Sequence, residues 1–324
     1  MAKHTAEDEL VHRLSRGFPS FRESGIRLGG GDDAALWAPR RGYETILTSD
    51  WFLEGSHFLR DTHPADSVGW KCLARAASDL AAMGGAPRCF LLNLALPSSH
   101  TGKWLDGFVG GLRRAGRFLH CAMAGGDTTR NQRILINVTV VGEIEKGKAV
   151  LRSGAKAGDL LFVSGRLGLA DLGLRELRRG RGLTRAKNQA LRKHLYPEPR
   201  IALGSWLASR GLAKAMMDVS DGLSTDLARL CAASGVGAKL DMRKLPMVES
   251  ISRRAALQLA LHGGDEYELL FATRAAAARK IPRRLEGVEI HCIGEIMKRK
   301  RIVLTEARGT QVELRPGGWD PFRK

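Results

Sequence analysis

Residues 64–96 read PADSVGWKCLARAASDLAAMGGAPRCFLLNLAL, and they give the clearest indication of the fold class. Pro64 is typical of the first position of a helix, and the residues after it predict a long helix that ends near Met83, before a pair of glycines. The apolar run from Cys89 to Leu96 then predicts a strand. Because helices that alternate with strands are typical of mixed proteins, we expect an α/β or α+β architecture.

The same alternation continues on both sides of this stretch. In the N-terminal part the pattern predicts helices over Thr5–Arg16 and Lys103–Phe118 and strands over Thr45–Thr48, ending at Ser49-Asp50, and Ile134–Val141. In the C-terminal part it predicts helices over Ala170–Arg178, Pro199–Ser209 and Asp221–Ala233, strands over Leu160–Ser164 and Glu268–Ala272, and a hairpin turn at Lys298–Arg301. A polar, glycine-bearing connector at 152–159 places the boundary between an N-terminal domain, 1–150, and a C-terminal domain, 151–324.

Composition narrows the class of protein. The chain has 324 residues, of which 44% are hydrophobic and 27% charged, and a length of this size favours about two globular domains. No apolar run approaches the roughly 18 residues of a membrane span, and the acidic start lacks the apolar core of a secretory leader. Five cysteines without a Cys-x-x-Cys pair are typical of reduced thiols, so we expect a cytoplasmic enzyme with no membrane partner.

The net charge is +18, from 52 basic and 34 acidic residues. Such an excess favours polyanionic partners, including nucleic acid, an anionic membrane or phosphorylated small molecules. The basic residues are dispersed and aromatic residues make up only 6%, so a solvated arginine-rich surface is favoured over a nucleic-acid-binding one.

Acidic residues recur beside glycine or serine at the ends of apolar stretches. They are Asp32-Asp33, Asp50, Asp79, Asp127, Asp218, Asp221 and Asp265-Glu266. Converging carboxylates repel one another unless a cation lies among them, and Mg²⁺ typically takes one or two carboxylates together with phosphate oxygens and water. If these side chains converge, they predict Mg²⁺ bridging to a phosphate.

Each acid taken alone also has a structural explanation. Gly-Asp-Asp at 31–33 is a common turn, Asp221 can cap the helix that it begins, and Asp127 and Asp265 can belong to a turn and a bulge. Asp79 differs, because an unpaired carboxylate inside an apolar helix costs several kcal/mol and calls for a partner. No Walker-type phosphate loop and no zinc spacing of histidines is present. His57, seven residues after Asp50, is either a structural loop residue or a phosphate contact.

Seven motifs, in order, resemble those of the thiamine-monophosphate kinase family, in the ATP-binding superfamily that includes aminoimidazole ribonucleotide synthetase. They are Gly29-Gly-Gly-Asp-Asp-Ala-Ala35, Thr48-Ser-Asp-Trp-Phe-Leu-Glu-Gly-Ser-His-Phe58, Ser78-Asp-Leu-Ala-Ala-Met-Gly84, Gly125-Gly-Asp-Thr-Thr129, Leu151-Arg-Ser-Gly-Ala-Lys156, Asp218-Val-Ser-Asp-Gly-Leu223 and Gly263-Gly-Asp-Glu-Tyr-Glu-Leu269. The resemblance covers about residues 28 to 320. It implies a two-domain synthetase-like fold whose N-terminal α/β domain pairs across a homodimer and whose C-terminal α/β domain covers the nucleotide.

The resemblance also implies an activity and a set of site residues. The activity is direct in-line transfer of the γ-phosphoryl group of ATP to thiamine monophosphate, with several Mg²⁺ ions and no phosphoenzyme. The implied metal ligands are Asp33, Ser49, Asp50, Asp79, Asp127, Asp218 and Asp221, of which Asp50, Asp79 and Asp127 assist the transfer. The implied ATP contacts are Gly126, Asp127, Arg152 and Ser220, and the implied thiamine-side contacts are His57, Asp265 and Trp319.

Two segments depart from the family pattern. Arg75-Ala76-Ala77 replaces Val-Asn-Leu/Val, and Leu169-Ala170 stands where Asp-Ser is usual at a helix start. Two alternatives stay open. One is another ATP-dependent synthetase of the superfamily, such as a selenophosphate or purine-pathway enzyme, although the first cysteine is Cys72 and none lies near the N-terminus. The other is a basic nucleic-acid-binding protein, which would bind with a steep salt dependence.

Overall fold

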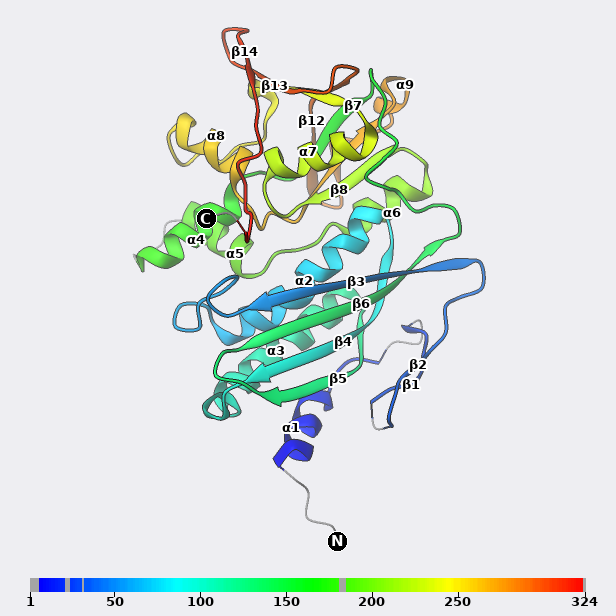
Figure 1. Ribbon diagram of the computed structural model, residues 1–324, viewed down its shortest axis with the longest axis vertical. Helices are drawn as coiled ribbons and strands as arrows, with labels where there is room; N and C mark the ends of the chain where they lie inside the picture. Colours follow the sequence, from blue (N-terminus) through cyan, green and yellow to red (C-terminus); the bar gives the residue numbers. More distant parts are fainter. Residues whose placement is uncertain (1–5, 21–23, 31, 181–184, 323–324) are drawn as a thin grey trace. The chain divides into compact units, whose positions relative to one another are not determined.

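The computed structural model describes residues 6–20, 24–30, 32–180 and 185–322 (Figure 1). The chain divides into two compact units. The N-terminal unit comprises Met1–Leu80 and Gly85–Gly147, and the C-terminal unit comprises Ala81–Gly84 and Lys148–Lys324. Within the described residues, no helix has the length and apolar character that crossing a lipid bilayer requires.

The N-terminal unit is built on a four-stranded sheet of order β3-β6-β4-β5, in which only β4 and β5 run parallel. Its strands are β3 (Tyr43–Leu53), β4 (Ala86–Leu96), β5 (Ala122–Arg130) and β6 (Leu135–Glu145). Figure 1 shows α2 (Ala65–Met83) and α3 (Lys103–Leu119) along one face of this sheet. The unit also contains α1 (Ala6–Ser15), the pair β1 (Ile26–Leu28) and β2 (Leu36–Trp37), and a 3₁₀ turn at Ser98–His100.

Two glycines let α2 and α3 cross in close contact. A Cβ atom on Gly111 would lie 1.8 Å from the carbonyl oxygen of Asp66, and one on Gly69 would lie 1.9 Å from that of Phe108. No side chain larger than hydrogen fits at either position without a movement of backbone. This crossing keeps both helices in one layer against the sheet.

The opposite face of the sheet carries exposed apolar side chains. Leu47 and Trp51 alternate with Ser49 on β3 and are 68% and 55% exposed, and Leu91 of β4 is 37% exposed. Ser49 and Leu91 both lie opposite Thr139 of β6, so all four residues belong to one face of the sheet. Exposed apolar side chains grouped on one face are typical of surfaces that bind a partner.

The C-terminal unit contains a sheet of order β14-β13-β9-β12-β7-β10-β8, with β11 paired to β12. Its strands are β7 (Leu160–Ser164), β8 (Ala215–Val219), β9 (Gly237–Asp241), β10 (Glu268–Thr273), β11 (Arg284–Leu285), β12 (Val288–Met297), β13 (Ile302–Thr305) and β14 (Gln311–Glu313). Its helices are α4 (Leu169–Arg179), α5 (Arg185–Leu195), α6 (Ile201–Ser209), α7 (Leu223–Ser234), α8 (Arg253–His262) and α9 (Ala275–Ala278), with a 3₁₀ turn at Met242–Lys244. The core of the unit packs α7 against β7, β8 and β9.

The mixed α/β class is confirmed, and so are most of the expected elements. The helix after Pro64 spans Ala65–Met83, the strand after it spans Ala86–Leu96, and β7 has the predicted bounds. The first helix spans Ala6–Ser15, and the expected cap, Thr5, lies outside the described residues.

Three expectations about the acidic motifs and the basic run are wrong. The strand β3 does not end at Ser49-Asp50 but continues to Leu53, because it pairs with β6 along its whole length. The Gly125–Asp127 motif does not end a short apolar piece but lies inside β5, which pairs with β4. Lys298–Arg301 is not the turn of a hairpin, because β12 and β13 each pair with β9, which lies between them.

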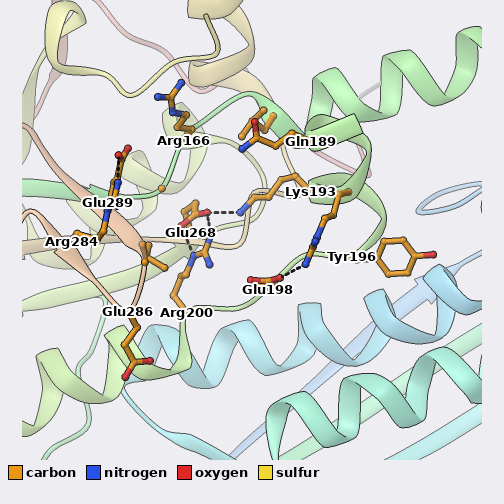
Figure 2. Close-up of a pocket in the computed structure, with 15 residues that line it drawn as sticks. Arg166, Gln189, Lys193, Tyr196, Glu198, Arg200, Glu268, Arg284, Glu286 and Glu289 are labelled. Carbon is orange, nitrogen blue, oxygen red and sulfur yellow. Dashed lines mark hydrogen bonds and ion pairs between the residues drawn. The ribbon is translucent and has the colours of Figure 1, made fainter. Parts of the chain in front are cut away.

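A buried ion-pair cluster fixes one end of β10. Glu268, 1% exposed, accepts hydrogen bonds from Lys193 of α5, from Arg200 at 2.5 and 2.7 Å, and from the Ser164 hydroxyl at 2.6 Å. Figure 2 shows the Lys193 and Arg200 side chains pointing at the Glu268 carboxylate. Burial raises the pKa of Glu268, but the two cations outweigh burial and lower that pKa to about 2.

The crossing of α2 and α3 gives a first prediction. Gly111→Ala should lower the free energy of unfolding by about 1–3 kcal/mol, because the added methyl overlaps the Asp66 carbonyl. Gly110→Ala is the matched control, since no atom lies within 4 Å of its added Cβ, and it should raise stability by roughly 0.5–1 kcal/mol. Urea unfolding monitored by circular dichroism measures both variants. Equal effects of the two substitutions would contradict the close crossing.

The Glu268 cluster gives a second prediction. Glu268→Gln leaves Lys193 and Arg200 without their carboxylate, and this should lower stability at neutral pH by about 3 kcal/mol. The pKa of Glu268 falls from 4.5 to about 2 on folding, so the ionised form stabilises the fold above pH 4.5. That stabilisation is lost as the pH falls from 4.5 towards 2, and the difference from the wild type should narrow over this window.

Thermal unfolding followed between pH 7 and pH 2.5 measures this difference. Glu249→Gln serves as the control, because its partner Arg166 and its own side chain are exposed, at 42% and 82%. A Glu268→Gln variant as stable as the control at pH 7 would show that the cluster does not stabilise the C-terminal unit.

Candidate active site

Four side chains join β3 to α2 in the N-terminal unit. Thr48 and Asp50 lie two residues apart on the strand and share a face, while Arg75 and Asp79 lie one turn apart on the helix. The Thr48 hydroxyl donates to Oδ2 of Asp79 at 2.5 Å. Arg75 donates to both oxygens of Asp50, from Nε to Oδ2 at 2.6 Å and from Nη2 to Oδ1 at 3.1 Å. Two expected metal ligands, Asp50 and Asp79, thus both lie at the contact between β3 and α2.

The side chain of Ser49 lies on the other face of the sheet. Its hydroxyl bonds to Oδ1 of Asn137 at 3.1 Å and to Oγ1 of Thr139 at 3.0 Å. Adjacent residues of a strand point to opposite faces, so the Ser49 hydroxyl and the Asp50 carboxylate do not meet.

The structure places the other expected ligands of this unit in exposed positions. Asp127 lies on β5, the last strand of its sheet, and accepts the Thr128 N–H on Oδ1 at 2.8 Å. Gly126 has φ 153°, and a Cβ there would lie 1.8 Å from the Leu92 carbonyl oxygen, so the strand requires glycine beside Asp127. Asp33 donates its backbone N–H to the side chain of Asp32 at 2.9 Å, as expected of a turn.

His57 shapes the loop that follows β3. Its Nδ1 accepts the Leu53 N–H at 3.0 Å, and its ring lies 5.8 Å from that of Phe52. His57 therefore has a structural role in this loop, through its bond with Leu53. A substrate contact through the rest of its ring stays a prediction.

In the C-terminal unit, the Ser220-Asp221 turn is held by a buried carboxylate. Oδ2 of Asp226, which is fully buried, accepts the N–H groups of Ser220 at 3.1 Å and Asp221 at 3.0 Å. Arg229 donates to Asp221 at 2.5 Å and to Asp226 at 2.8 Å. Burial, followed by the nearby Asp221, raises the pKa of Asp226 to about 6. Asp221 does not cap α7, which begins after Gly222.

Two expected thiamine-side residues converge on the same turn. The N–H of Asp265 donates to the Ser220 carbonyl, and the N–H of Trp319 donates to the Asp221 carbonyl, both at 2.8 Å. The C-terminal segment is fastened further by Gly318, which donates to Thr225 Oγ1 at 3.1 Å. The turn thus brings together four expected site residues from distant parts of the sequence: Ser220, Asp221, Asp265 and Trp319.

The remaining expected residues of this unit lie on the strand before the turn and at the start of the unit. Asp218 belongs to β8, is 3% exposed, and lies opposite Leu269 of β10. Arg152 is exposed, and its carbonyl oxygen accepts the Ser234 hydroxyl at 3.1 Å.

Two buried residues lie beside this group: Glu266, which the sequence named only as part of the Asp265-Glu266 pair, and His194, which it did not indicate. Oε1 of Glu266 accepts the N–H groups of Gly168 at 2.8 Å and Ala170 at 3.0 Å, so it supplies the polar contact that Leu169-Ala170 lacks at the start of α4. Burial raises the pKa of Glu266 to about 8. His194 is 1% exposed, and its Nδ1 lies 3.9 Å from Oδ2 of Asp265. The contacts of both residues are made with segments distant in sequence, so the sequence does not reveal them. The only indication in the sequence is that Glu266 directly follows Asp265.

A cavity of about 760 Å³ is lined by the Glu268 cluster, by α5 and by the turn before β12 (Figure 2). Charged side chains of both signs line it, and the basic ones have carboxylate partners: Arg166 with Glu249, Arg192 with Glu198, Lys193 and Arg200 with Glu268, and Arg284 with Glu289. None of the expected site residues lines this cavity.

The expected Mg²⁺ can be tested against the oxygen donors. Carboxylates are the hard donors that Mg²⁺ prefers, and Asp50, Asp79 and Asp221 fit that chemistry. Within the described residues, no three or more His, Cys, Asp or Glu side chains form a group that could hold a metal ion. A Mg²⁺ ion held by such carboxylates would also bind phosphate oxygens and water, as Mg²⁺ commonly does.

Comparison with known proteins identifies the family of the chain. The N-terminal domain of AIR synthase related proteins matches residues 31–144, and the C-terminal domain of these proteins matches residues 156–306. Thiamine-monophosphate kinase of Escherichia coli (strain K12) is 35% identical over 319 residues, which cover 95% of this chain and 97% of the relative.

Two solved structures are also similar. The thiamine-monophosphate kinase of Stenotrophomonas maltophilia K279a has 35% identity and a TM-score of 0.79, over 92% of this chain and 94% of its own. AaThiL, complexed with AMPPCP and TMP, has 32% identity and a TM-score of 0.77, over 90% of this chain and 91% of its own. The protein therefore belongs to the thiamine-monophosphate kinase family of the AIR synthase related proteins.

Proposed function

We propose that the protein transfers the γ-phosphoryl group of ATP to the phosphate of thiamine monophosphate, giving thiamine diphosphate and ADP. This proposal rests on one observation: nearly the whole chain matches thiamine-monophosphate kinases, and a similar solved structure, AaThiL, is complexed with AMPPCP and TMP. Phosphoryl transfer requires positioning and charge neutralisation more than a covalent nucleophile. The acceptor is an anionic phosphate oxygen, so no strong general base is needed.

The proposed roles follow the acidic motifs. We assign the metal ligands to Asp33, Ser49, Asp50, Asp79, Asp127, Asp218 and Asp221, with the Ser49 contribution limited to its main chain because its hydroxyl faces the other side of the sheet. Mg²⁺, when bound, would neutralise the phosphate charge. The proposed ATP contacts are Gly126, Asp127, Arg152 and Ser220. The proposed thiamine-side contacts are His57, Asp265 and Trp319. Trp319 is 47% exposed, so its ring is available to stack on a heterocycle.

We further propose that residues 1–150 form the ATP- and Mg²⁺-binding domain, that 151–324 form the synthetase-like domain, and that the enzyme is a cytoplasmic homodimer. The open face of the N-terminal sheet supports a dimer, because Leu47 and Trp51 are more than half exposed on it. A second copy of the same face would bury these side chains.

Kinase activity is the direct test. Purified protein with ATP, Mg²⁺ and thiamine monophosphate should release ADP in a coupled assay and form thiamine diphosphate. Asp50→Asn and Asp127→Asn should each lower turnover at least about a hundredfold, because loss of a proposed metal ligand misplaces the cation and removes several kcal/mol of transition-state stabilisation. Asp106→Asn, which removes an exposed partner of Arg13, is the control and should retain the wild-type rate. Absence of turnover by the wild type at millimolar substrate would contradict the proposed activity.

Light scattering after gel filtration tests the dimer. Trp51→Glu should shift the mass from two chains to one, because a charge at the centre of the face must be desolvated on association. Val312→Glu introduces the same charge at an exposed position of β14 and should leave the mass unchanged. A wild-type mass of one chain would exclude the dimer.

A further inference from the structure

Two carboxylates of the candidate site, one in each unit, are bound by an arginine of the helix that follows them. Both oxygens of Asp50 accept hydrogen bonds from Arg75 of α2, and Oδ2 of Asp221 accepts one from Arg229 of α7 at 2.5 Å. These contacts are a feature of each unit taken separately. They place a fixed positive charge at the atoms that are expected to ligate a cation.

The Asp50–Arg75 pair is held rigidly. The Arg75 side chain is 15% exposed and that of Asp50 27%, so solvent screens their attraction less than at an open surface. The Arg75 guanidinium also lies over the ring of Phe52, 5.4 Å from its centroid. A two-point guanidinium–carboxylate contact of this kind has a fixed geometry and is among the stronger ion pairs.

The Asp221–Arg229 pair differs in having a second anchor. Arg229 is 45% exposed, but it also donates to the fully buried Asp226 at 2.8 Å. Asp226 in turn holds the N–H groups of Ser220 and Asp221. Arg229 therefore neutralises two carboxylates that would otherwise repel each other across this turn.

We propose that Arg75 and Arg229 are resident counter-cations, which occupy Asp50 and Asp221 and must release them before these carboxylates can ligate a divalent cation. This inference rests on the proposed ligand roles of the two aspartates. The guanidinium of Arg75 uses both oxygens of Asp50, that of Arg229 uses Oδ2 of Asp221, and the positive charge of each opposes the approach of a second cation. The arginines thus keep the acidic residues in place without metal, and they lower the affinity of these positions for it.

Mn²⁺ binding to the full-length protein, without nucleotide, tests the proposal independently of activity. Free Mn²⁺ is measured by electron paramagnetic resonance during titration of the wild type and of Arg75→Met, which keeps the packing on Phe52 and removes the charge. Loss of a partly exposed ion pair should raise Mn²⁺ affinity by roughly three- to tenfold. Arg229→Met should also bind Mn²⁺ more tightly than the wild type, and Arg75→Lys, which keeps the charge, should stay close to it.

Two controls locate the effect. Arg114→Met breaks the exposed pair with Asp66, outside the proposed site, and should leave Mn²⁺ affinity unchanged. Adding Asp50→Asn to Arg75→Met should abolish the gain, because the oxygens that were set free are then no longer charged. Unchanged or weaker Mn²⁺ binding by both Met variants would overturn the proposal. A wild type without kinase activity whose Met variants still gain affinity would contradict the proposed function and leave the ion exchange intact.

Discussion

Neutralisation of carboxylates by the protein's own donors is the constraint on which the rest of the structure depends. A buried carboxylate without a partner costs several kcal/mol, so each must find a cation or N–H groups as the chain folds. Arg229 meets this need for Asp226 and Lys193 with Arg200 for Glu268, and Arg75 does the same for the half-buried Asp50. Some of the basic residues are therefore built into the units as partners of carboxylates and do not belong only to a solvated surface.

The sequence predicted those elements whose signals are local. The helix α2 follows a proline and stops at glycines, and β4 and β7 are apolar runs of ordinary strand length. The helix α5, RAKNQALRKHL, was not predicted, because it has few apolar residues and depends on burial of Ala190 and on the Lys193–Glu268 pair. The position of β9 between β12 and β13 was not predictable either, since long-range pairing leaves no local pattern.

The candidate site was predictable in its residue types and only partly in its geometry. The family resemblance implied Ser220, Asp221, Asp265 and Trp319, which the structure brings to one turn, but these contacts run through the main chain and leave no trace in residue identity. The separation of Ser49 from Asp50 was available from strand alternation once β3 is recognised to continue past both residues. The partners of Glu266 and Glu268 come from segments about 70 to 105 residues away and required the structure.

The central claim is that the carboxylates of the acidic motifs hold divalent cations against the phosphates of both substrates. Crystals grown with Mn²⁺, AMPPCP and thiamine monophosphate test it most directly, because anomalous scattering locates each Mn²⁺ ion independently of the protein density. We expect anomalous peaks within ligand distance of carboxylate oxygens of Asp50 and Asp79 in the N-terminal unit and of Asp221 in the C-terminal unit. Well-ordered AMPPCP and thiamine monophosphate with no peak at any of these carboxylates would contradict the account.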